Sequence, residues 1–170
     1  TVVGDGARGP NPEGKRINSF GAHFAEVEVN VETGQIRVLK LIAVHDVGRI
    51  VNPVTAANQV HGGVVQAVGL SMMEQRVMDQ ETGVHLTGDL EGYKLPTMLD
   101  APRIDVSFVD RSEAEANSVG AKGLGEPPII PAPAALANAV SDALGIRMTD
   151  LPMTPGRVLQ AINSTERARE

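Results

Sequence analysis

Residues 120–140 constrain this chain more than any other stretch. They contain three glycines within six residues, then one carboxylate, Glu126, and then two consecutive prolines. Glycine lets the main chain pass close to a bulky group, and Pro127 and Pro128 restrict the backbone that carries the acid. The segment predicts a rigid turn that presents a single acid, which is the arrangement that a general base requires. A simpler interpretation is that Glu126 only complements the dipole of the Ala-rich helix predicted after it.

The composition narrows the class of protein. A chain of 170 residues can form one domain with a core, and with three Phe, one Tyr and no Trp that core must be built from aliphatic side chains and Met. The formal net charge of −6 argues against binding of nucleic acid, which requires a basic surface. No apolar run is long enough to cross a membrane. The absence of cysteine excludes disulfides, thiolate metal sites and cysteine nucleophiles within these residues.

The first third of the chain predicts a β-hairpin. Apolar and polar residues alternate over 25–31, which gives one buried and one exposed face. The Glu-Thr-Gly string at 32–34 predicts the turn, and residues 35–44 predict the returning strand. Further along, the pattern predicts a second hairpin over 76–86 and a strand over 104–109.

Three helices are predicted, over about 53–74, 130–144 and 155–162. Asn52 can cap the first of them ahead of a proline, and a break near Asn58 is an alternative to one continuous helix. This helix contains Gly62, Gly63 and Gly69, each of which costs roughly 1 kcal/mol relative to Ala. The three glycines therefore predict either the close approach of another backbone or a ligand, or tight packing on a sheet.

Together these elements predict one α+β domain over 20–163, with hairpins and strands packed against three or four helices. Residues 1–19 predict an irregular N-terminal loop, and the charged residues 164–170 predict a frayed tail. Glycines in the N-terminal loop spell G-x-G-x-x-G over 4–9. A Pro-Asn-Pro string follows at 10–12, where a dinucleotide site would need a helix, so we reject dinucleotide binding.

Seven strings in the chain occur in an order that is specific although each string alone is weak. They are FGAHFAEVEV (20–29), VHDVGR (44–49), NP (52–53), QVHGGVVQAVG (59–69), YKLP (93–96), GAKGLGEPP (120–128) and LPMTP (151–155). Together they resemble the C-terminal part of the molybdopterin-binding subunit of the xanthine dehydrogenase / aldehyde oxidase family of molybdenum hydroxylases. The resemblance runs over about 20–162, and it implies the fold of the C-terminal molybdopterin-binding domain.

The resemblance implies an oxidoreductase that uses a molybdenum cofactor, molybdopterin, either as such or as its cytosine dinucleotide. Such an enzyme oxidises an aldehyde or a purine-like N-heteroaromatic substrate with oxygen from water. The family's base falls on Glu126, which would take the proton from a molybdenum-bound hydroxyl. No side chain of the protein is expected to ligate the metal. The cofactor performs the redox chemistry, and the protein supplies a positioned base and a pocket.

The same resemblance assigns five residues to cofactor binding. Gln59 matches a glutamine near the pterin, and its side-chain amide can both donate and accept hydrogen bonds. The alternative is that Gln59 is a solvated helix residue. The backbone N–H groups of Lys122, Gly123, Leu124 and Gly125 are expected to bind pterin or phosphate oxygens.

A complete molybdenum-binding subunit of this family is several times longer than 170 residues. We therefore expect the remaining N-terminal part of that subunit as a partner, with iron–sulfur clusters and FAD on other domains or subunits, and no catalysis by the isolated chain. The alternative function is a structural or assembly module that keeps the fold without chemistry. The strings at 79–83 and 120–123 resemble the bacterial aldehyde-oxidising branch of the family more than its animal xanthine enzymes. We expect a cytoplasmic location, with the periplasm as the alternative.

Overall fold

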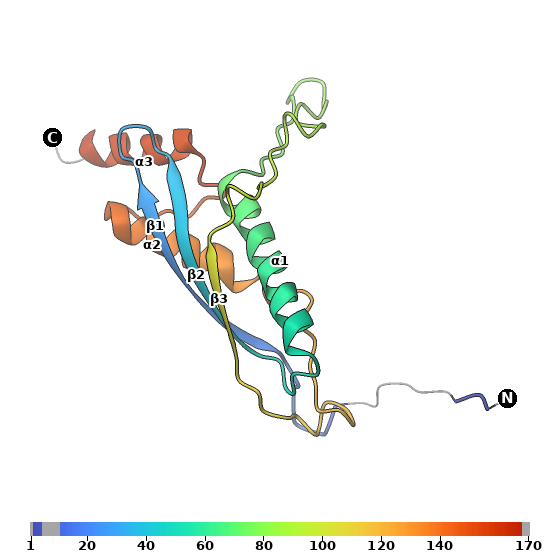
Figure 1. Cartoon of the computed structure of the whole chain (residues 1–170). Coiled ribbons are helices and arrows are strands. Elements are labelled where there is room, and N and C mark those ends of the chain that lie inside the picture. The colour runs from blue at the N-terminus through green and yellow to red at the C-terminus, as the bar shows by residue number, and fades with distance from the viewer. Residues whose placement is uncertain (1, 5–10, 168–170) are drawn as a thin grey trace.

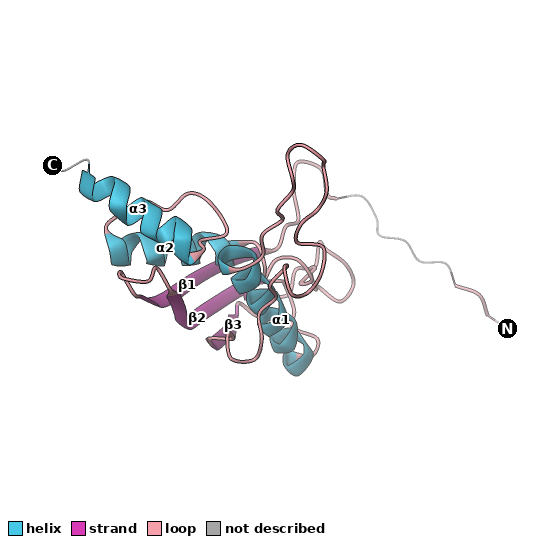
Figure 2. Ribbon diagram, turned by 90° about the horizontal axis from the view of Figure 1, so that it is seen from above, coloured by secondary structure: helices cyan, strands magenta, loops and turns pink. Residues whose placement is uncertain are grey.

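A three-stranded sheet forms the centre of the molecule, and helices pack on one of its faces (Figure 1, Figure 2). The computed structural model describes residues 2–4 and 11–167, and the N-terminal glycine string lies largely outside them. No helix within the described ranges has the length and apolar character needed to cross a membrane. The elements follow in the order β1 (Phe20–Val29), β2 (Ile36–Asp46), α1 (Pro53–Met72), β3 (Arg103–Phe108), α2 (Pro131–Leu144) and α3 (Pro155–Arg167). This content confirms the predicted α+β class.

The first hairpin confirms its prediction. β1 and β2 pair antiparallel, from Phe20 opposite Asp46 to Val29 opposite Ile36, with one irregularity in the register. Gly34 in the connecting turn has φ 72°, the left-handed conformation that glycine adopts without steric cost. A side chain at Gly34 would also collide with the main chain at the start of α3. Glycine at this position therefore both closes the hairpin and lets the last helix approach it.

α1 connects the hairpin to β3, which pairs parallel with β2 in the order β1-β2-β3. The side-chain oxygen of Asn52 accepts two N–H groups of the first turn, as predicted for a helix cap. The predicted break near Asn58 is wrong, because a polar residue on an exposed helix surface costs too little to interrupt it. The predicted second hairpin is reduced to one bridge between Met78 and His85. That loop projects from the body (Figure 1), and a hairpin without a packing surface is marginal.

The two C-terminal helices begin where the sequence predicts. α2 ends at Gly145, which has φ 64° in the expected left-handed cap. α3 runs to Arg167, so its predicted end at Ile162 is wrong. The hydroxyl of Thr165 donates back to the Ala161 carbonyl within the helix, so a polar sequence continues it. The expected tail is thus helical up to that point, and residues 168–170 lie outside the described residues.

The core lies between the sheet and the helices, and it consists of aliphatic side chains and methionines as the composition predicts. The largest side chains that are fully buried in it are Leu41, Val60, Val64, Val68, Leu136, Val140, Met153 and Val158. Burial of each such side chain stabilises the fold by about 1.5–3 kcal/mol. α2 lies across the hairpin and beside α1, so the two helices share one apolar layer against the sheet (Figure 2).

Two buried histidines interrupt this apolar layer. The Nε2 atoms of His23 on β1 and His45 on β2 lie 2.9 Å apart, and the rings meet edge to face. One ring must donate and the other accept, so at most one ring of the pair can carry a positive charge. The Nδ1 atom of each ring is buried and has no partner among the described residues. Burial lowers the pKa of His23 to about 4, with the charge of His45 adding to the effect, and burial also lowers the pKa of His45.

The histidine pair predicts that acid destabilises the fold. Below pH 6.5 the unfolded chain binds a proton at each histidine, whereas folded His23 resists protonation until about pH 4. The contribution of His23 to the free energy of unfolding is therefore fully present above pH 6.5. It is lost as the pH is lowered toward 4, which reduces the free energy of unfolding by on the order of 3 kcal/mol. Urea unfolding of the chain over this range measures the slope, and His23→Phe should reduce it. The control His85→Gln changes an exposed histidine and should leave the slope unchanged.

Candidate functional site

The glycine-rich loop of residues 120–128 lies against the end of β2 and near the start of β1 (Figure 1). Gly48 forms an antiparallel bridge with Ala121. The Lys122 N–H donates to the Val47 carbonyl at 2.7 Å. These main-chain contacts extend the strand pairing of β2 onto the loop, which fixes the loop backbone just before Glu126.

Two further residues, Arg49 and Asn117, hold the first half of the loop. The Arg49 N–H donates to the Gly120 carbonyl at 2.8 Å, and a side chain at Gly48 would collide with that same carbonyl. Gly48 also has φ 71°, so both its backbone conformation and the lack of space for a side chain require glycine there. The Asn117 side chain accepts the Gly120 N–H at 2.8 Å and donates to the Ala121 carbonyl at 2.7 Å. The loop is therefore held by its own neighbouring residues as well as by β2.

The Lys122 side chain links three elements. Its Nζ lies 2.9 Å from Asp46 Oδ1 at the end of β2 and 5.5 Å from the centre of the Phe20 ring at the start of β1. Only 7% of the side chain is exposed. Its hydrogen bond to the Asp46 carboxylate lowers the pKa of that carboxyl. Asp46 also accepts the Gly48 N–H at 3.2 Å, so one carboxylate supports both the turn and the lysine.

The predicted backbone donors divide into two groups. The N–H of Lys122 is taken by Val47, so this donor does not face a ligand. The next three N–H groups, on Gly123, Leu124 and Gly125, have no acceptor among the described residues. An added Cβ at Gly123 or Gly125 would meet nothing within 4 Å. The fold itself therefore does not require these two glycines, and the space above them is open.

Glu126 lies at the rim of a shallow depression of about 630 Å³ formed by this loop and by residues 17–20. The Ser19 hydroxyl donates to the Gly123 carbonyl at 2.6 Å and joins the two walls. Glu126 is exposed, and within the described ranges no hydrogen bond or ion pair engages its carboxylate. The Ile129 N–H donates to the Glu126 carbonyl at 2.9 Å, which fixes the turn behind the acid. The residues that line the depression are Ile17, Asn18, Ser19, Phe20, Gly123, Gly125, Glu126, Pro127 and Ile130.

α1 supports the other side of the loop. The Gln59 amide donates to the Gly125 carbonyl at 3.4 Å, a long hydrogen bond between two residues that the sequence assigned to the same site. One turn further on, an added Cβ at Gly63 would lie only 2.6 Å from the Pro128 Cβ. Gly63 therefore lets the helix pack directly on the second proline of the Gly-Glu-Pro-Pro turn. The prediction of close backbone approach holds at this glycine, whereas Gly62 faces open space.

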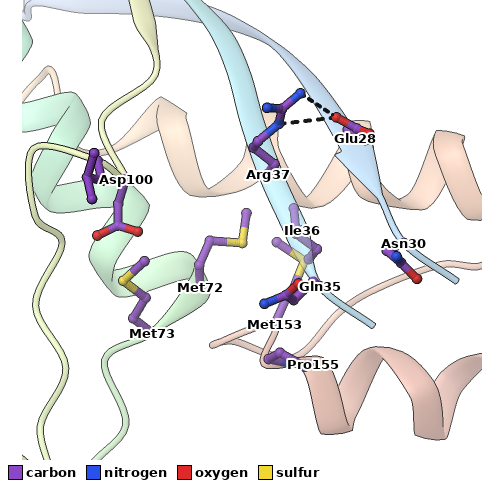
Figure 3. Close-up of a pocket in the computed structure, with 11 residues that line it drawn as sticks. Glu28, Asn30, Gln35, Ile36, Arg37, Met72, Met73, Asp100, Met153 and Pro155 are labelled. Atoms are coloured by element: carbon purple, nitrogen blue, oxygen red, sulfur yellow. Dashed lines mark hydrogen bonds and ion pairs between the residues drawn. The ribbon is translucent and has the colours of Figure 1, made fainter. Parts of the chain in front are cut away.

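A second cavity, of about 620 Å³, lies at the opposite end of the hairpin (Figure 3). Its lining includes Met72, Met73 and Met153, and the ion pair of Glu28 with Arg37 stands at its edge. Glu28 and the Phe20 of the first depression are eight residues apart on one strand, a separation of roughly 26 Å. This cavity is therefore separate from the loop that carries Glu126.

Metal-ligating side chains do not gather in the part of the chain that the structure describes, where no group of three or more His, Asp or Glu residues could hold a metal ion. Among the sequence-predicted residues, the structure brings Gln59, Glu126 and the three open N–H groups together. The side-chain role of Lys122 was missed. A Gly-Lys-Gly string gives no sign of its partner, since Asp46 lies 76 positions earlier in the chain.

Comparison with known proteins decides the family. The family model for a molybdopterin cofactor-binding domain matches residues 5–102, more than half of the chain. The chain belongs to this family. It is 39% identical over 142 residues to the xanthine dehydrogenase molybdenum-binding subunit of Escherichia coli O157:H7. The matched region covers 84% of this chain and 19% of that subunit. It is 38% identical over 145 residues to the aldehyde oxidoreductase molybdenum-binding subunit of E. coli K12, with 85% and 20% covered.

Solved structures give the same result for the fold. The crystal structure of quinoline 2-oxidoreductase from Pseudomonas putida 86 superposes with a TM-score of 0.77 at 34% identity. The match covers 83% of this chain and 18% of that one. The chain thus has the fold of a molybdenum-binding domain of this family and spans about a fifth of the length of the relatives it matches.

Adjacent glycines of α1 provide a matched test of the helix contact that supports Glu126. Gly63→Ala should destabilise the fold by about 1–3 kcal/mol, because the new methyl group overlaps Pro128. Gly62→Ala should stabilise it by up to about 1 kcal/mol, because the position is open and Ala has the higher helix propensity. Urea unfolding measures both. Equal effects of the two variants would show that α1 does not pack on the turn.

The buried lysine predicts an energetic coupling between the loop and β2. Lys122→Met keeps the length of the side chain but leaves the Asp46 carboxylate without its cation. A double-mutant cycle with Asp46→Asn should give a coupling of about 1–2 kcal/mol, less than for a fully buried pair because a third of Asp46 is exposed. Lys15→Met, in the exposed pair with Glu115, serves as the control and should have no measurable effect. A coupling of zero would mean that the Lys122 contact does not hold the loop.

Proposed function

We propose that the chain is the C-terminal part of the molybdenum-binding subunit of an oxidoreductase of the xanthine dehydrogenase and aldehyde oxidoreductase type, with Glu126 as its general base. The observation that carries the proposal is the unengaged carboxylate of Glu126 beside three open N–H donors on a loop fixed to β2. The names of the relatives support an aldehyde or an N-heteroaromatic ring as the substrate class.

The loop residues fit a molybdopterin cofactor. Pterin and phosphate oxygens accept hydrogen bonds, and the N–H groups of Gly123, Leu124 and Gly125 are unpaired donors in adjacent positions. The missing Cβ atoms at the two glycines leave room for a ligand to approach the main chain closely. Gln59 reaches the same loop and would hold its orientation or contact the cofactor edge. The cofactor would bind here as molybdopterin or as its cytosine dinucleotide.

The protein's contribution to the chemistry is a fixed proton acceptor. When bound, the molybdenum cofactor supplies the two-electron oxidation of the substrate with oxygen from water. Glu126 accepts a proton at its carboxylate, which no cation of the described residues neutralises. The prolines after it and the Ile129 hydrogen bond limit the backbone movement of the acid. Phe20 and Ile130 line the same depression and would supply apolar walls beside the acid once further polypeptide and the cofactor cover it.

Further polypeptide is part of the proposal. The chain corresponds to about a fifth of the relatives, so the remaining part of the molybdenum-binding subunit would complete the cofactor site. Iron–sulfur clusters and FAD on other domains or subunits would receive the electrons. We place the assembled enzyme in the cytoplasm, and we expect no turnover from the 170 residues alone.

Replacement of the acid tests the proposal. In the assembled enzyme, Glu126→Gln should lower kcat by about 10²–10⁴-fold, because the amide cannot accept the proton. The molybdenum content of the purified enzyme should stay unchanged, since the cofactor donors are main-chain groups. Glu32→Gln, in the exposed turn of the hairpin, should leave both unchanged. Unchanged turnover in the Glu126 variant would favour the structural-module alternative.

A further inference from the structure

The face of the sheet that points away from the helices is uncovered throughout the part of the chain that the structure describes (Figure 2). The core side chains of β2, such as Leu41 and Ala43, point toward the helices, so their neighbours in sequence point to the open face. This face divides into two halves of different chemistry, one at each end of the hairpin.

The half near the hairpin turn is charged, and within the described residues its charges are paired on the face except that of the exposed Glu26. Glu28 lies 2.6 Å from Arg37, a pair that Figure 3 shows, and Lys40 lies 2.7 Å from Asp105. Arg103 lies 3.2 Å from the same aspartate. Exposed ion pairs of this kind suit contact with water. This charged half therefore has no need of a protein partner.

The half near the start of β1 is apolar, with exposed residues on β1 and half-buried residues on β2. Phe24 lies opposite Ile42 in the antiparallel register, and Ala22 lies opposite Val44, so the four side chains form one contiguous patch. Phe20 extends the patch by one more position along β1. Phe20 and Phe24 are each 63% exposed. Apolar patches that are contiguous and bordered by charged residues mark interaction surfaces.

The free edge of β1 adds main-chain groups to this apolar half. In the described ranges β1 pairs only with β2, so its ten residues leave a second edge without a strand partner. The strand contains no proline, and charged side chains occur only in its second half. Long, flat and apolar edges are rarely left uncovered in native proteins. The edge and the apolar face together suit an extended apolar segment from further polypeptide.

The apolar half is continuous with the Glu126 site. Phe20 belongs to the apolar patch and also lines the depression beside Glu126. The Lys122 ammonium lies over the same ring, so the position of Phe20 is coupled to the loop. A segment seated on the patch would therefore form the missing side of the depression. A single docked segment would then both cover the apolar half and complete the depression beside Glu126.

We propose that the apolar half of the open sheet face, formed by Phe20, Ala22, Phe24, Ile42 and Val44, is the surface on which another part of the molybdenum-binding subunit docks. The proposal rests on the proposed function. The length of the relatives selects this occupant, since 84% of this chain matches only 19% of theirs and the rest of the subunit must contact it somewhere. The shared Phe20 places that contact at the open site.

Photo-crosslinking in the assembled enzyme tests the docking surface. The substitution Phe24→p-benzoylphenylalanine places a reactive aromatic group on the apolar half. The matched control is Glu28→p-benzoylphenylalanine, on the same strand and face, since both residues are exposed. After irradiation, mass spectrometry identifies the crosslinked peptide. Melting temperatures confirm that both variants fold.

The expected result is a crosslink from position 24 to a peptide of the molybdenum-binding subunit other than residues 1–170, several-fold more abundant than from position 28. A crosslink to a second copy of this chain or to an iron–sulfur or FAD protein overturns the proposal, and so does an equal yield from both positions. The molybdenum content of the same sample separates the two proposals. The expected crosslink in an enzyme without molybdenum would keep the interface and reject the proposed function.

Discussion

The contact between the end of β2 and the glycine-rich loop is the constraint on which the site depends. The N–H of Lys122 bonds to Val47, and the bridge at Gly48 continues the strand pairing into the loop. The main-chain pairing ends at Lys122, and the next three N–H groups have no acceptor among the described residues. If Gly48 were any other residue, its side chain would collide with the loop, and the pairing would be lost.

This constraint explains the division of labour among the glycines. Gly48 and Gly63 are needed by the fold, since a Cβ at either position would meet the loop or its prolines. Gly123 and Gly125 face open space and have ordinary φ values, so the fold gives no reason for them. This open space fits the cofactor-binding role that we propose for the loop, because a ligand could approach the main chain closely there. Gly48 and Gly63 therefore have structural roles, and we propose a functional role for Gly123 and Gly125.

Sequence reasoning recovered what local chemistry determines. The hairpin turn at Gly34, the cap at Asn52 and the α2 end at Gly145 follow from conformational preferences of single residues, and all three are confirmed. The order of the motifs identified the family. The end of α3 was wrong by five residues, because polar residues near a helix terminus can satisfy their own hydroxyl groups within the helix.

What sequence could not supply is the set of pairings between distant residues. Lys122 and Asp46, or His23 and His45, carry no local signal of each other, because only the sheet register and the loop path bring them together. The apolar half of the open face is hidden for the same reason. Alternation in β1 predicts one buried and one exposed face, but the cross-strand partners Ile42 and Val44 are what turn scattered exposed residues into a patch.

Amide hydrogen exchange of the 170-residue chain tests the central claim most directly. If the loop is fixed to β2 by main-chain pairing, the amides of Lys122 and Arg49 should be protected to a degree similar to the strand amides of β2, while those of Gly123, Leu124 and Gly125 exchange rapidly. Binding of molybdopterin in the assembled enzyme should then protect these three. Rapid exchange at Lys122, at the rate of Gly123, would contradict the account.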